Sequence, residues 1–185
     1  MAFEPFTPPA KGWAPPTGGL THSQARGIGH VVSAWAILEA VLQHTLVTLT
    51  QAPLTLGQAL TEDLGPDNRL KALKRLCQTW LIGMGDRYPD HSAIVAKVDE
   101  VRKWIEGQKG LRNQIAHWQW IRQTDEKVFG FKYTMRVSSD PTTSQAFLTA
   151  DTKDFTEFGE AINEKTDELI ELRNKLDGLP TWPHR

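Results

Sequence analysis

The stretch "HVVSAWAILEAVLQHTLVTLT", residues 30–50, predicts a long helix that is buried on one side. Its apolar side chains recur at steps of three and four, which places them on one face of an α-helix. They are Val31, Trp35, Leu38, Leu42 and Leu46. We expect the helix to cover residues 22–50, with Thr21 or Ser23 as N-cap and Pro53 beyond its end. Polar residues interrupt the apolar run, which favours a core helix over a membrane span.

Apolar periodicity predicts three further helices and a small sheet. The helices cover residues 67–84, residues 91–107, and residues from Asp151 or Thr152 to Leu176, with a short helix or turn over residues 55–68. Gly107 and Gly110 weaken the third helix, so residues 111–120 form either a kinked continuation or a separate segment. An alternating run (Val128, Phe129, Phe131, Tyr133, Met135, Val137) with turn signals at residues 124–125 and 139–141 predicts two or three antiparallel strands.

These elements predict a mainly α protein with four main helices in a bundle and a small antiparallel β insertion, at about residues 119–150, before the last helix. Residues 1–20 contain five prolines and three glycines and predict an extended arm. We expect this arm to contact the body through Phe3, Phe6 and Trp13. Residues 21–178 form one helical domain in this interpretation, and residues 179–185 form a C-terminal tail.

Composition limits the choice of function. The 185 residues carry a net charge of −1, so nucleic acid or an anionic membrane would have to be bound by a local patch. Four basic residues, Arg69, Lys71, Lys74 and Arg75, form such a cluster, which is either a solvated face or a phosphate-contacting one. The single cysteine, Cys77, allows no disulfide within the chain and is expected to be a buried packing thiol rather than a reactive one. The N-terminus does not resemble a signal peptide, which favours a cytoplasmic protein with no membrane partner.

Functional residues are predicted in the segment "LRNQIAHWQW", residues 111–120. At about 100° per residue, Asn113 and His117 lie within about 140° of Arg112 on a helix, while Leu111, Ile115 and Trp118 lie on the opposite side. The helix therefore presents a guanidinium, an amide and an imidazole on one face. This set suits phosphoryl transfer without a metal. Histidine can exchange protons near neutral pH, arginine can bind phosphate, and asparagine can orient the imidazole or bind substrate.

The motif "RNQIAH", residues 112–117, resembles that of the HEPN superfamily, in which arginine is followed by a polar residue and, after four to six residues, by histidine. The leading helix with "WAILEAVL" and the final amphipathic helix are also similar to the four-helix layout of that family. The resemblance implies a metal-independent endoribonuclease that needs no cofactor. His117 would assist attack of the ribose 2′-hydroxyl on the adjacent phosphate, and Arg112 would stabilise the phosphorane.

The same resemblance implies a homodimer with the two motifs facing each other across the interface, and a context such as a toxin–antitoxin or antiphage defence system. RNA is the expected substrate, and an antitoxin or regulatory protein is a further expected partner. Lys109 is a candidate phosphate contact, and Trp120 would stack on a base if the helix continued that far. Glu39 lies on the apolar face of the first helix. It is either part of a structural ion pair or a supporting residue that pairs with Arg112 or holds His117.

Two other interpretations compete with the ribonuclease. The same polar face could belong to a non-catalytic HEPN-like module that binds a partner protein, RNA or a nucleotide. It could also be an incidental surface of a structural domain, with His117 bonded to its own chain. Catalysis predicts that His117 and Arg112 reach solvent, whereas a structural role predicts a buried imidazole.

Overall fold

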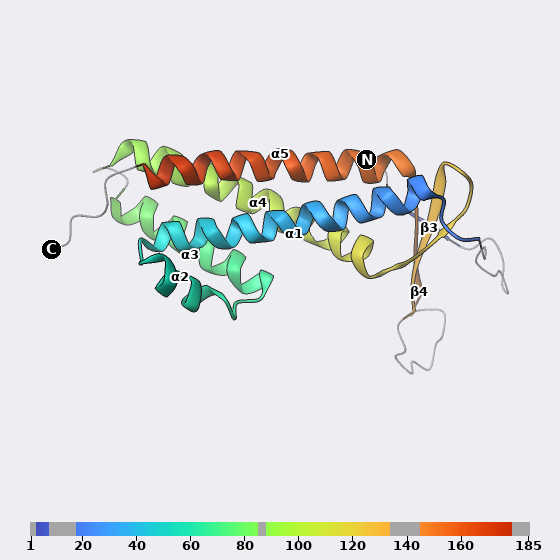
Figure 1. The fold of residues 1–185 in the computed structure, drawn as a ribbon, viewed down its shortest axis with the longest axis horizontal. Coiled ribbons are helices and arrows are strands. Elements are labelled where there is room, and N and C mark those ends of the chain that lie inside the picture. The colour runs from blue at the N-terminus through green and yellow to red at the C-terminus, as the bar shows by residue number, and fades with distance from the viewer. Residues whose placement is uncertain (1–2, 8–17, 85–87, 134–144, 179–185) are drawn as a thin grey trace. The chain divides into compact units, whose positions relative to one another are not determined.

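The computed structural model describes residues 3–7, 18–84, 88–133 and 145–178, which fall into two compact units. Unit 1 comprises the residues up to Trp35 together with 110–162, and unit 2 comprises 36–109 together with the residues from Asn163 onward. Three helices contribute to both units: α1 (His22–Thr50), α4 (Pro89–His117) and α5 (Thr152–Asp177) (Figure 1). The expectation of one domain over residues 21–178 stays a prediction.

The described residues form five helices and a small antiparallel sheet, so the predicted class, mainly α with a β insertion before the last helix, is confirmed. Unit 2 contains the two remaining helices, α2 (Leu54–Thr61) and α3 (Pro66–Met84). Its core is built from the predicted apolar faces, including Leu38, Leu42, Leu46, Leu73, Val98, Ile105 and Leu169. The periodicity in the sequence therefore identified the buried faces of α1, α3, α4 and α5.

Cys77 is a buried packing residue of unit 2, as predicted. Burial raises the pKa of its thiol to about 12, and the neighbouring Asp99 carboxylate adds to the increase. Because the thiolate is the reactive form, Cys77 is inert at neutral pH.

The helix α4 continues through Gly107 and Gly110 to His117 without interruption. The sequence left open whether residues 111–117 continue the helix or form a separate segment, and the structure shows a continuation. Both glycines are exposed, and a side chain added at either position would meet no atom within 4 Å. They lower helix propensity without breaking the backbone hydrogen bonds.

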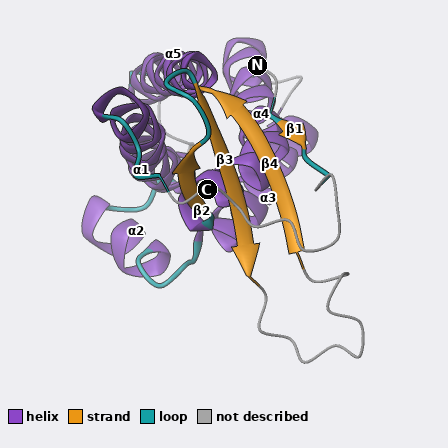
Figure 2. Cartoon of the chain, turned by 90° about the vertical axis from the view of Figure 1, so that its right-hand side faces the viewer, coloured by secondary structure: helices purple, strands orange, loops and turns teal. Residues whose placement is uncertain are grey.

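The sheet belongs to unit 1 and has the order β1-β4-β3-β2, with every pair antiparallel (Figure 2). Its strands are β1 (Glu4–Pro5), β2 (Gln119–Arg122), β3 (Lys127–Tyr133) and β4 (Gln145–Asp151). The N-terminal arm thus contributes a short edge strand in addition to the strands expected from the sequence. Phe3 and Phe6 pack edge-on against Phe155 and Phe129, as predicted, whereas Trp13 lies outside the described residues. Met135, Val137 and the predicted turn at 139–141 also lie outside them.

A capping box begins α1 and joins it to the sheet. The Gln24 backbone N–H donates to Thr21 Oγ1, and the Thr21 N–H donates to Gln24 Oε1, at 3.2 and 2.9 Å. The Nε2 atom of the fully buried Gln24 side chain donates to the carbonyl oxygen of Thr124, at 2.8 Å, in the turn between β2 and β3. Thr21, rather than Ser23, is therefore the N-cap. The hydrogen bonds that the Gln24 side chain donates also fix the sheet turn relative to the first turn of α1.

By length and composition alone, α1 could cross a membrane. Half of its most apolar 18-residue window is buried inside the protein, and core helices of soluble proteins pass the same test. Its apolar face is occupied by packing, in keeping with the predicted core helix.

Candidate functional site

The three residues of the predicted catalytic set lie in the last two turns of α4, within unit 1. Arg112 and Asn113 are half-buried, and His117, the last residue of the helix, is exposed. Ile115, on the predicted inward face, is only 1% exposed. The helix therefore buries its apolar side and leaves the imidazole in contact with solvent, the arrangement that a reaction on a large substrate requires.

Two contacts within unit 1 hold the Arg112 guanidinium. Its Nη1 donates a hydrogen bond to Asn113 Oδ1 at 3.1 Å, and its Cζ lies 5.8 Å from the centre of the Trp35 ring. Trp35 comes from α1 and is 3% exposed, so it is a rigid aromatic support. Cation–π contact with a buried tryptophan holds the guanidinium and restricts its orientation. Arg112 is thus positioned before any ligand arrives.

The sequence did not predict the contact between Trp35 and Arg112. The helical periodicity identified Trp35 only as part of the apolar face of α1. These residues are 77 positions apart, since 112 − 35 = 77, and no local pattern links them. Gln24, which ties the sheet turn to α1, was missed for a different reason. The capping-box spacing Thr21-x-x-Gln24 is visible in the sequence and could have identified Gln24 as a helix-start residue.

Trp120 is the second residue of β2 and closes the C-terminal end of α4. Its indole N–H donates to the Ile115 carbonyl oxygen at 2.9 Å, which satisfies one of the carbonyls that a helix end leaves free. Its ring packs edge-on against Phe155 and covers Gly130, where an added Cβ would lie 2.6 Å from a ring carbon. Much of the indole is thus engaged within unit 1. Because α4 ends at His117, the helix does not continue to Trp120 as the stacking on a base required, and a substrate contact of Trp120 stays a prediction.

Replacing Trp120 with phenylalanine should lower the free energy of unfolding by about 1 kcal/mol or more, because the helix-end hydrogen bond is lost while most of the ring packing remains. Urea unfolding followed by circular dichroism would measure the change. Trp118, which is half-buried and stacks on Trp120 at 6.4 Å between ring centres, provides the matched control. The Trp118 indole makes no hydrogen bond within the described part of the chain. Equal losses of stability for Trp118→Phe and Trp120→Phe would therefore contradict the proposed cap.

The remaining predicted site residues belong to unit 2. The Lys109 ammonium forms an ion pair with Asp67 at the start of α3, so a phosphate would have to compete with a carboxylate for it. Glu39 is half-buried on α1 and belongs to unit 2, whereas Arg112 and His117 belong to unit 1. The supporting role of Glu39 and the substrate contact of Lys109 both stay predictions.

Histidine, cysteine and carboxylate side chains nowhere gather in threes suited to a metal ion within the described ranges. Comparison with known proteins adds no further constraint, since no family model, curated protein or solved structure matches the chain.

Proposed function

We propose that this protein is a metal-independent endoribonuclease of the HEPN type, built on a four-helix HEPN-like arrangement of α1, α3, α4 and α5 with the β insertion before α5. The observation that carries the proposal is the end of α4, where an exposed imidazole shares one helix with a preoriented guanidinium. A structural histidine would more often be buried against its own chain, and His117 is not.

The chemistry follows from the groups on this face. The ribose 2′-oxygen forms a bond to the adjacent phosphorus while the bond from phosphorus to the 5′-oxygen breaks. His117 accepts the proton of the 2′-hydroxyl or donates one to the departing 5′-oxygen. Arg112 binds the non-bridging oxygens and stabilises the charge that develops on the phosphorane. Asn113 holds Arg112 and can donate its own N–H groups to substrate.

A dimer completes the mechanism, because one imidazole cannot at once remove and supply a proton. Two copies of α4 with their ends facing would place one His117 on each side of the scissile phosphate. We therefore propose a homodimer with a composite cleft. A toxin or antiphage-defence context, an antitoxin or regulatory partner, and a cytoplasmic location remain predictions that belong with this function.

The direct test is to incubate the purified chain with a mixed RNA pool in EDTA and to identify the product ends. We expect cleavage that leaves 2′,3′-cyclic phosphate and 5′-hydroxyl ends, together with a dimer by light scattering. The matching DNA pool is the control, since DNA lacks the 2′-hydroxyl nucleophile. Cleavage of DNA, or loss of RNA cleavage on adding EDTA, would contradict the proposed mechanism.

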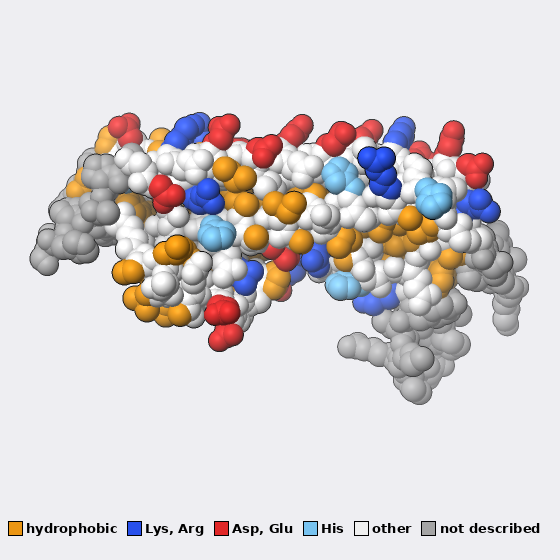
Figure 3. Space-filling model, viewed as in Figure 1, with side chains coloured by type: hydrophobic (Ala, Val, Ile, Leu, Met, Phe, Trp, Pro, Cys, Tyr) orange, Lys and Arg blue, Asp and Glu red, His pale blue; other side chains and the backbone are white. Residues whose placement is uncertain are grey.

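A non-catalytic module that binds a partner protein is the second candidate, and one feature favours it. The short helix α2 exposes Leu54, Leu56 and Leu60 by 59%, 52% and 62%. Figure 3 shows apolar side chains gathered where Figure 1 places α2. Contiguous exposed apolar surface often marks a protein interface. Intact RNA under all conditions would favour this function.

A further inference from the structure

The helix α3 exposes a stripe of three cations, Lys71, Lys74 and Arg75, which we name the basic stripe. Their spacing of three and four residues puts them next to one another on one face of the helix. None of the three has an ion pair among the residues that the structure describes. Arg69, which the sequence grouped with them, is half-buried, and its Nη2 lies 3.4 Å from the Glu62 carbonyl oxygen. The structure therefore separates a structural arginine from a solvent-facing stripe.

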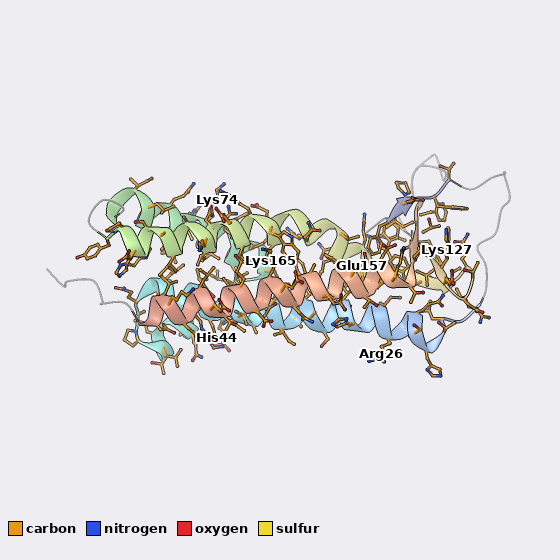
Figure 4. The ribbon with its side chains drawn as sticks, turned by 90° about the horizontal axis from the view of Figure 1, so that it is seen from above. Arg26, His44, Lys74, Lys127, Glu157 and Lys165 are labelled. Atoms are coloured by element: carbon orange, nitrogen blue, oxygen red, sulfur yellow. The ribbon has the colours of Figure 1, made fainter. Side chains whose placement is uncertain are left out.

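Several other cations of unit 2 are neutralised by neighbouring carboxylates. Lys109 pairs with Asp67, and Arg102 and Lys103 both pair with Asp99. Acidic side chains follow one another along α5 at the edge of the visible face (Figure 3). Like charges three and four residues apart destabilise a helix, so an unpaired stripe of one sign is unfavourable without a ligand. In Figure 4, Lys74 points outward, at the opposite edge of unit 2 from His44.

We propose that the basic stripe of α3 binds the sugar–phosphate backbone of RNA. The choice of RNA as the polyanion rests on the proposed function. Adjacent cations on one helix face suit a chain with a charge on each nucleotide, and such binding releases counterions. An anionic membrane fits less well. Membrane-binding clusters usually carry four to eight basic residues, and the next residue along this face, Gln78, is polar and exposed.

The test measures binding apart from cleavage, using the His117→Ala protein and fluorescein-labelled polyuridine RNA in an anisotropy titration across a salt series. Replacing Lys71, Lys74 and Arg75 with glutamine should weaken binding at least about tenfold at low salt. It should also reduce the slope of log K against log salt by about 2, because three phosphate contacts are lost from a single strand. All three side chains are exposed, so circular dichroism should show unchanged helix content.

The matched control removes the same charge from scattered exposed positions, through Arg26→Gln, Lys97→Gln and Lys175→Gln on α1, α4 and α5. We expect less than about a threefold loss from this variant, since it breaks no line of phosphate contacts. Equal losses in the two triple variants would overturn the proposal, as would unchanged binding by the stripe variant or no binding by the parent. If the stripe variant lost binding to phosphatidylserine vesicles but kept the parental binding to RNA, the stripe would be reassigned to a membrane.

The two proposals fail in different ways. Stripe-dependent RNA binding by a parent chain that never cleaves RNA would support the basic stripe and contradict the ribonuclease. Cleavage that depends on His117 but is equally strong in the stripe variant, with equal RNA binding, would support the ribonuclease and overturn the stripe.

Discussion

Replacing His117 with alanine is expected to lower the rate of RNA cleavage by about 10²–10⁴-fold, the usual contribution of a positioned acid or base. The change should affect chemistry rather than folding. His117 is exposed at the last position of α4, so its side chain contributes little to the core. The measurement is the single-turnover rate on a labelled RNA in EDTA, with RNA binding recorded separately. A rate loss with unchanged binding would place the imidazole in the reaction.

His22→Ala is the matched control, because His22 is an exposed histidine at the other terminus of a helix, the first residue of α1. It should cleave RNA at the parental rate. If His117→Ala and His22→Ala were equally active, His117 would have no part in catalysis. Equal loss of activity in both would point to a general requirement for charge or folding. Mixing His117→Ala protein with Arg112→Ala protein tests the composite cleft, since mixed dimers keep one intact copy of each residue.

Replacing Phe155 with alanine is expected to lower the free energy of unfolding by about 3–5 kcal/mol, as for other large buried aromatic residues. Phe155 is fully buried near the start of α5, and its ring lies 5.2 Å from the rings of both Trp120 and Phe3. Removing it leaves a cavity beneath the residue that closes the end of α4. Because small domains have only about 5–15 kcal/mol of stability, the loss is a large share of the total. Denaturant unfolding gives the measurement.

Glu160→Ala provides the control on the same helix, because Glu160 is exposed and should change stability by less than about 0.5 kcal/mol. Phe155→Leu keeps an apolar side chain in the cavity and should lose less than Phe155→Ala. This variant keeps the prediction testable if the alanine variant does not fold. Equal stabilities for Phe155→Ala and Glu160→Ala would contradict the role of Phe155 in the core of unit 1.

Much of the local structure could be predicted from the sequence because it depends on short-range spacing. The steps of three and four in residues 30–50 identify α1 and its buried face, and the same periodicity identifies the face of α4 that buries Ile115. Gly178 marks the end of α5 at Asp177. The burial of Cys77 followed from its place between apolar neighbours. The placement of Arg112, Asn113 and His117 on one helix was also predicted, since it follows from local periodicity alone.

Tertiary structure decided the features that join distant residues. The sequence by itself determined that Arg112 and His117 lie on one helix. Only the folded chain placed Trp35 under Arg112, paired the arm with β4 through Glu4, and engaged Trp120 with Phe155 and Gly130. The physical reason is range. Helix spacing acts over three or four residues, whereas packing contacts form between any surfaces that the fold brings together, and no single-sequence pattern records which ones meet.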